Sequence, residues 1–237
     1  EQLVGKSGAA KITPQTQKRI LSQVHHFLDW AYHEGHSPKL DFSAVRVDQK
    51  GRVASYAVPT DPEVKQMLNA DHPVIGRVLL FCLLSGMLSG EATGLLCEDL
   101  VWKGNLGWFA RVRPNRVRQL KTDAAERVVP IHGALADLLP SMPDDRLFPH
   151  LTVSTVTKAF ATFRTQLGIA RPGLVFHSTR KWFITQCERT GVPEHYTASL
   201  VGHQSARSEN RLTYGIYSAG ISDTQKREIV DGIRLPT

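Results

Sequence analysis

The sequence predicts an α+β protein that is mainly helical and carries one small antiparallel β-sheet. Three observations lead to this prediction. Apolar residues recur at intervals of three and four near the N-terminus, residues 74–87 form an almost continuous apolar run, and residues 102–131 alternate between apolar and polar side chains. Helical stretches on both sides of a short alternating stretch indicate helices packed against a small sheet.

The composition indicates a packed globular protein with a preference for polyanions. The chain has 237 residues, of which 41% are hydrophobic, and 29 Lys and Arg outnumber 22 Asp and Glu to give a net charge of +7. Such a surplus favours phosphate-rich partners, although many basic proteins bind no nucleic acid. No apolar run is long enough to span a bilayer, so we expect no membrane partner. The three cysteines lack metal-site spacing, so we expect free thiols in a reducing cytoplasm and no bound metal.

The first predicted element is an amphipathic helix over residues 13–34. Thr13 can cap its start, Pro14 suits the first turn and Gly35 can end it. Its apolar stripe consists of Ile20, Val24, Phe27 and Ala31. The stretch that follows has no long periodic pattern of apolar residues. We therefore expect a helical domain over residues 1–50, a linker over 51–59 and a second domain over 60–237.

The second domain is predicted to begin with a helix whose start signal is Thr-Asp-Pro-Glu at residues 60–63. The apolar run at 74–87 predicts a buried helix in the core. Short antiparallel strands are expected within residues 102–131, with Trp108, Ala110 and Val112 on one side. After the strands, helical patterns return at residues 134–139, 154–167, 178–190, 194–200 and 222–233.

Groups suited to phosphate chemistry gather in the C-terminal third of the chain. The sequence reads FHSTR at residues 176–180, LVGH at 200–203 and LTYGIY at 212–217. His177 and Arg180 are three residues apart, so on a helix both could donate hydrogen bonds to one anion. A nearby phenol adds a nucleophile that can form a covalent phosphoester.

These motifs resemble the tyrosine recombinases, the phage-integrase type of site-specific DNA strand transferase. The resemblance covers about residues 60–220, and SGMLSGEA at 85–92 looks like the Thr-Gly-x-Arg-x-Ser-Glu segment of the family. LKT at 120–122, followed by VPI at 129–131, looks like the family's Lys-Thr hairpin. The helix at 13–34 is similar to the last long helix of the core-binding domain. The resemblance therefore implies the DNA breaking-rejoining catalytic fold, preceded by part of a core-binding domain.

The resemblance also implies roles for individual residues. Tyr217 is the expected nucleophile, and Tyr214 is the alternative, because the spacing after the LVGH motif is longer than in compact members. Arg180 would hold the scissile phosphate with its planar fork. His177 and His203 would donate to the same phosphate, with His177 also placed to take the phenolic proton. Each of these side chains has an ordinary packing explanation when it is considered alone.

Two further positions complete the expected site, and one departs from the family pattern. Lys121 is the candidate acid for the 5′ oxygen, and Glu91 matches the family's acidic residue. Leu88 stands where the family has its first arginine and cannot donate to a phosphate oxygen, so we expect slowed cleavage, either in an altered or in a naturally impaired copy. Arginines around the hairpin are candidate sequence-blind DNA contacts: Arg111, Arg113, Arg116, Arg118 and Arg127.

The expected function is therefore site-specific recombination or integration of double-stranded DNA through a 3′-phosphotyrosyl intermediate, without metal or cofactor. The resemblance implies a homotetramer on DNA that can exchange the C-terminal helix at 222–233, in a bacterial or phage-encoded cytoplasmic protein acting at the nucleoid. Two alternatives remain. A catalytically silent DNA-binding protein with this fold would fit Leu88, and a type IB topoisomerase shares related chemistry.

Overall fold

The chain divides into two units, Glu1–Ser55 and Tyr56–Thr237. A computed structural model describes residues 12–41, 45, 47, 55–120, 125–139, 145–203 and 220–236. In this part of the chain the structure is mainly helical with a three-stranded antiparallel sheet, as the sequence predicts. None of the helices in these segments combines the length and apolar character needed to cross a membrane.

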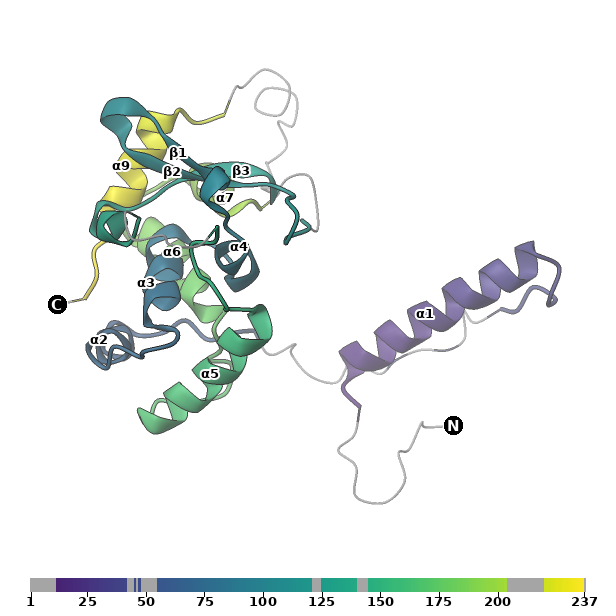
Figure 1. Ribbon diagram of the computed structural model, residues 1–237. Coiled ribbons are helices and arrows are strands. Elements are labelled where there is room, and N and C mark those ends of the chain that lie inside the picture. Colours follow the sequence, from purple (N-terminus) through teal and green to yellow (C-terminus); the bar gives the residue numbers. More distant parts are fainter. Residues whose placement is uncertain are drawn as a thin grey trace. The chain divides into compact units, whose positions relative to one another are not determined.

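The N-terminal unit contains the long helix α1 (Pro14–His33), which Figure 1 shows as a single rod. Its start follows the predicted signals, because the Thr13 side chain accepts a hydrogen bond from the Thr16 N–H at 3.2 Å and Pro14 occupies the first turn. Burial along the apolar stripe of α1 is uneven. Ala31 is buried, whereas the side chain of Phe27 is 60% exposed, because little of the described part of this unit packs against the helix.

The second unit is built around buried helices. The helices that the structure describes are, in chain order, α2 (Asp61–Asn69), α3 (Gly76–Ser85), α4 (Ser89–Thr93), α5 (Val153–Gln166), α6 (Ser178–Arg189), α7 (Glu194–Val201) and α9 (Asp223–Gly232). Helix α3 lies against α6 in the middle of this unit (Figure 1). Most side chains of α3 are buried, which confirms the core helix expected from the apolar run. Trp182 and Phe183 of α6 are also core residues.

The start of α2 is held by paired polar contacts. The Thr60 N–H donates to Glu63 Oε2 at 2.7 Å, and the Glu63 N–H donates to the Thr60 hydroxyl at 3.3 Å, which together form a capping box. Arg171 adds a bidentate ion pair to the same carboxylate, at 2.8 and 3.0 Å. The Trp182 indole N–H donates to Asp61 at 3.0 Å and joins α2 to α6. The residues of the predicted helix-start signal therefore also make contacts that hold α2 to other parts of the unit.

The sheet has the strand order β1 (Leu100–Trp102), β2 (Trp108–Val112), β3 (Arg127–Pro130), with both pairs antiparallel. Ala110 pairs with Val129 and joins the helical core, together with Val112. The 3-10 helix η1 (Cys97–Asp99) precedes β1, η2 (Gly104–Leu106) joins β1 to β2, and η4 (Gly133–Leu138) follows β3. The short antiparallel strands expected within residues 102–131 are thus present.

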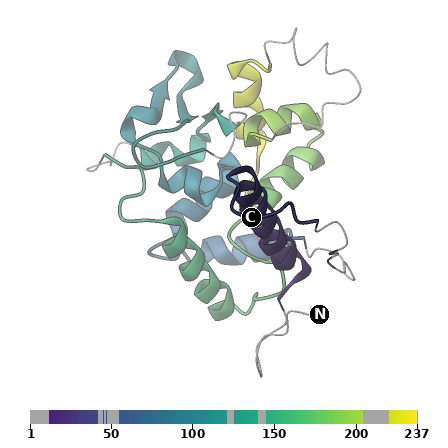
Figure 2. The same cartoon turned by 90° about the vertical axis from the view of Figure 1, so that its right-hand side faces the viewer.

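The C-terminal helix α9 packs on the sheet of its own chain, and both views place it beside the strands (Figures 1 and 2). Arg227 lies 5.1 Å from the Phe109 ring and donates to the Trp108 and Ile131 carbonyls, each at 2.7 Å. Val230 is fully buried. Phe109 is therefore buried although it lies opposite the core-facing residues of β2, because α9 covers it. The period-two pattern did not predict this second covered face.

Gly86 and Gly191 allow a test of close packing at a helix end. Both have positive φ, +65° and +76°, but a Cβ at Gly86 would lie 2.5 Å from Phe183 Cδ1, whereas a Cβ at Gly191 meets nothing within 4 Å. We predict that Gly191→Ala loses about 1 kcal/mol of unfolding free energy through backbone strain. Gly86→Ala should lose about 1–3 kcal/mol more through overpacking. Urea denaturation followed by tryptophan fluorescence measures both, and equal losses would contradict the contact with Phe183.

Candidate active site

A buried carboxylate, that of Glu91, lies at the centre of the candidate site. Glu91 is in the first turn of α4 and is only 6% exposed. Its Oε2 accepts the backbone N–H of Leu88 at 2.8 Å, which caps the helix. A carboxylate taken out of water must be paired and hydrogen-bonded, so its remaining partners define the site.

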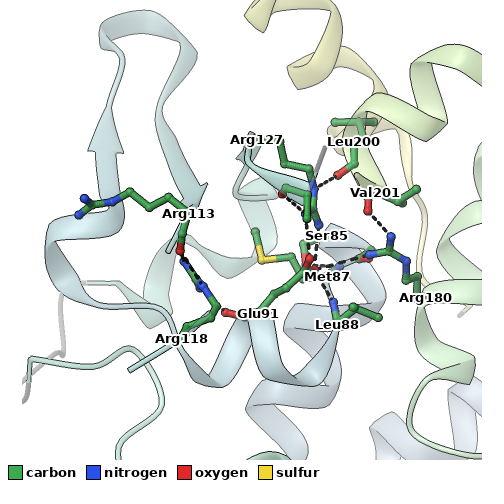
Figure 3. Close-up of polar contacts among 12 residues, drawn as sticks. Ser85, Met87, Leu88, Glu91, Arg113, Arg118, Arg127, Arg180, Leu200 and Val201 are labelled. Carbon is green, nitrogen blue, oxygen red and sulfur yellow. Dashed lines mark hydrogen bonds and ion pairs between the residues drawn. The ribbon is translucent and has the colours of Figure 1, made fainter. Parts of the chain in front are cut away.

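Arg127 of β3 is the main partner of Glu91. Its Nη1 and Nη2 donate to Glu91 Oε1 and Oε2, each at 2.8 Å, in a bidentate ion pair. The same guanidinium donates through Nε to the Leu200 carbonyl at 2.6 Å and through Nη1 to the Ala125 carbonyl at 2.9 Å. Figure 3 shows these contacts converging from β3, α4 and the end of α7. Arg127 therefore joins three elements that are distant in sequence.

Arg180 reaches the same carboxylate from α6 (Figure 3). It is 3% exposed, and its Nη1 lies 3.6 Å from Glu91 Oε2. Nη1 also donates to the Gly86 carbonyl at 3.0 Å, and Nη2 donates to the Val201 carbonyl. Its buried Nε finds no hydrogen-bond acceptor within the described segments. This guanidinium is thus oriented by the chain, and one of its buried donors has no partner among the described residues.

His203 follows the end of α7, where Gly202 adopts a left-handed conformation with φ +68°. The helix ends at the LVGH motif because glycine accepts this conformation without strain. The His203 N–H donates to the Ala198 carbonyl at 3.0 Å. Its side chain is exposed at the rim of the buried cluster. The motif thus places an accessible imidazole next to the two buried arginines.

The electrostatics of the cluster follow from burial and from its two cations. Burial raises the pKa of Glu91, but Arg127, the Leu88 N–H and the charge of Arg180 together outweigh it, so this pKa lies below its ordinary value. Burial lowers the pKa of Arg180 to about 10, and Glu91 opposes that shift. Arg180 therefore stays protonated at neutral pH. Burial, Arg180 and Arg127 together lower the pKa of His203, which favours its neutral form at neutral pH.

His177 lies at the start of α6, one turn before Arg180, and its side chain is exposed. Its ring packs against the ring of Tyr56, with 5.1 Å between centroids. The Tyr56 carbonyl accepts a hydrogen bond from Lys181 at 2.7 Å, so the first residues of the second unit are held beside this helix. The expected nucleophile Tyr217, its alternative Tyr214 and the expected acid Lys121 lie outside the described residues. Their roles stay predictions.

Leu88 is half-buried at the position just before α4. Its backbone N–H caps the helix through Glu91, and its side chain supplies no donor. The structure thus places the residue that departs from the family pattern beside the buried carboxylate (Figure 3).

The arginines expected to contact DNA differ in their surroundings. Arg118 is 7% exposed and donates to the carbonyls of Glu91 and Arg113, each at 2.8 Å, so its donors hold the chain itself. Arg113 donates to the buried Asp99 at 2.7 Å. Arg116 forms an ion pair with Asp145, and Arg111 is exposed on β2. The exposed side chains of Arg111 and Arg116 are the ones placed to meet a polyanion.

The sequence did not single out Arg127 as part of the site and grouped it with the other hairpin arginines. One signal could have distinguished it, since it is the first residue of the apolar strand β3, where it pairs with Val112 of β2. No group of His, Cys, Asp and Glu in the described segments is arranged to hold a metal ion.

Comparisons with solved structures identify the fold. An integrase from mycobacterium phage Brujita matches with a TM-score of 0.58 and 16% identity over 95% of this chain and 74% of its own. A lambda integrase dimer bound to a COC′ core site matches with a TM-score of 0.67 and 18% identity over 90% of this chain. The XerH site-specific recombinase bound to a palindromic difH substrate matches with a TM-score of 0.59 and 14% identity over 92% of this chain and 64% of its own. The chain spans 59% of the lambda integrase chain.

The chain therefore has the fold of tyrosine recombinases and integrases, which confirms the fold that the motifs imply. No protein-family model matches the sequence, and a search of curated proteins finds no match either.

Because the ion pair between Glu91 and Arg127 is buried, we expect its loss to lower the free energy of unfolding strongly. Arg127→Ala should lower the free energy of unfolding by about 3–5 kcal/mol, because it removes the bidentate partner of a buried carboxylate. Arg171→Ala is a matched control, since Arg171 makes a similar pair with Glu63 while its own side chain is 39% exposed. That change should cost about 1 kcal/mol or less. Chemical denaturation of both variants checks the difference, and equal losses would show that burial does not govern the pair.

Proposed function

We propose that this chain is a site-specific DNA recombinase or integrase that cleaves and rejoins DNA through a 3′-phosphotyrosyl intermediate. The observation that carries the proposal is the buried cluster of Glu91, Arg127 and Arg180 beside His203 in a recombinase fold. Two guanidinium cations and one carboxylate leave a single positive charge. A phosphodiester carries the single negative charge that would neutralise it.

The proposed reaction balances without a cofactor. The Tyr217 hydroxyl attacks the scissile phosphorus and loses its proton to His177, while the bond from phosphorus to the 5′ oxygen breaks. Lys121 gives the departing oxygen its proton. The free 5′ hydroxyl of a partner strand then attacks the phosphotyrosyl ester, which restores the diester and the phenol. Because the ester conserves the bond energy, rejoining needs no nucleotide hydrolysis.

Arg180 and His203 would stabilise the charge that builds on the nonbridging oxygens. Arg180 is fixed by the Gly86 and Val201 carbonyls and keeps a buried, unpartnered Nε donor among the described residues. Donors that are oriented before the reaction lower the barrier without reorganisation. His203 adds an accessible imidazole at the same place. This arrangement supports phosphoryl transfer better than a merely structural ion pair.

The proposed partner is double-stranded DNA, with a homotetramer as the working assembly in the bacterial or phage-infected cytoplasm. Exposed Arg111 and Arg116, with the partly exposed Arg113, would contact phosphates independently of sequence. Exchange of α9 between subunits would require it to leave the sheet that it covers in its own chain. The residues 204–219 before α9 would supply the length for such an exchange.

Leu88 favours one second candidate, a DNA-binding protein with this fold that has lost cleavage. The side chain of Leu88 offers no donor to a phosphate, and loss of one transition-state donor slows chemistry by about 10²–10³. Both candidates would bind DNA, and only the recombinase would form a covalent adduct.

We predict that the chain forms a denaturation-resistant adduct with members of a pool of nicked duplexes of randomised sequence. Tyr217→Phe should abolish the adduct, because it removes the attacking oxygen, and Tyr214→Phe should keep it. Gel analysis under denaturing conditions and sequencing of the trapped DNA measure both. The opposite pattern would make Tyr214 the nucleophile, and no adduct with any variant would favour the silent DNA-binding protein. Site-independent relaxation of a supercoiled plasmid would instead indicate a topoisomerase.

Leu88→Arg should accelerate adduct formation by about 10²–10³, because it adds a donor at the phosphate. Ser89→Arg is the matched control, since it adds the same charge one residue away. A similar gain in both variants would show that the added charge only strengthens DNA binding. An unchanged rate in Leu88→Arg would remove this position from the proposed site.

A further inference from the structure

Arg127 joins the start of α4 to the end of α7. It extends from β3, binds both oxygens of Glu91 at the start of α4, and donates to the Leu200 carbonyl at the end of α7. Its side chain is 5% exposed. Each of its three nitrogens already donates to the chain, so any contribution of Arg127 to ligand binding must pass through the residues that it holds.

The turn that carries His203 lies directly against Arg127. A Cβ at Gly202 would lie 2.8 Å from Arg127 Nη1 and 3.2 Å from Ala125 Cα. A Cβ so close to Nη1 would force the guanidinium to shift, so the glycine allows this contact as well as the positive φ. The position of the imidazole after this turn therefore depends on where the guanidinium lies.

Arg127 is linked to the other arginine of the site through Glu91. Glu91 lies between the two guanidinium groups, bidentate to Arg127 at 2.8 Å and 3.6 Å from Arg180. Leu88, the neighbouring position where the resemblance expects a cation, supplies none. Arg127 is thus the counter-charge that keeps Glu91 in place and leaves Arg180 with donors for a phosphate.

We propose that Arg127 is a positioning residue of this site: its fork clamps Glu91 and the Leu200 carbonyl so that Arg180 and His203 face one phosphate group. The inference rests on the proposed function, because it names how the phosphate position of that site is built. Fork geometry carries the effect, since a lysine would keep the charge but could not bind both carboxylate oxygens and the carbonyl together.

Two variants separate geometry from charge. Arg127→Lys keeps the net charge of the cluster and loses the fork. Glu91→Gln removes the negative charge and breaks the bidentate pair. If the fork positions the site, both variants should weaken phosphate binding by about fivefold or more, a loss of about 1 kcal/mol. If charge alone mattered, Arg127→Lys would bind as the unchanged chain does and Glu91→Gln would bind more tightly.

The measurement is an NMR titration of the full chain with inorganic phosphate at low ionic strength, following the arginine Nε–H signal that Arg180→Lys removes. Arg171→Lys is the matched control, because Arg171 forms a bidentate pair with Glu63 and has no contact with the Glu91 cluster in the described residues. It should bind phosphate as the unchanged chain does. Circular dichroism reports whether each variant folds. If Arg127→Lys does not fold, the phosphate affinity of Glu91→Gln tests the inference.

Unchanged affinity in a folded Arg127→Lys, tighter binding by Glu91→Gln, or no response of the unchanged chain to phosphate would each overturn the inference. Its failure can be distinguished from failure of the proposed reaction. Fork-dependent phosphate binding without a covalent adduct would leave the inference standing and reject cleavage. An adduct that forms equally fast in Arg127→Lys, with unchanged phosphate affinity, would support cleavage and reject the role of Arg127.

Discussion

The burial of the Glu91 carboxylate is the constraint on which the candidate site depends. A carboxylate in the interior is tolerated only where cations and donors surround it, because isolated burial costs many kcal/mol. Here the partners come from three separate elements, with Arg127 on β3, Arg180 on α6 and the Leu88 N–H at the start of α4. Pairing this one group therefore brings the sheet and the helices into a single arrangement around it.

The same pairing leaves the site incomplete in a way that suits a ligand. One anion is shared between two buried cations, and the Arg180 Nε–H is buried without an acceptor in the described segments. A buried donor without a partner costs about 1–3 kcal/mol. An incoming phosphate oxygen would remove that cost and balance the charge at once. In the proposed function, stability withheld from the free protein in this way would become available to phosphate binding, which is how a preorganised anion site differs from a structural ion pair.

Most of the fold could be predicted because its signals are local. Thr13 and Pro14 begin α1, the capping residues at 60–63 begin α2, and the apolar run gives α3. What the sequence missed depends on contacts between distant residues. Phe109 is buried because α9 returns to cover it, and Arg127 gains its role from Glu91, thirty-six residues earlier. Charge and spacing could not distinguish Arg127 or the buried Arg118 from arginines that face solvent.

Leu88 affects chemistry and folding differently. The contribution of this residue to the fold is its backbone N–H, which donates to Glu91 whatever the side chain is. The ion pair that a first arginine could have offered Glu91 is made by Arg127 instead. Leucine can therefore stand at this position without leaving the buried carboxylate unpaired. In the proposed reaction its cost would fall on the transition state, where a donor to the phosphate would be missing, so a folded, DNA-binding chain and a slow strand-transfer reaction would be compatible in one molecule.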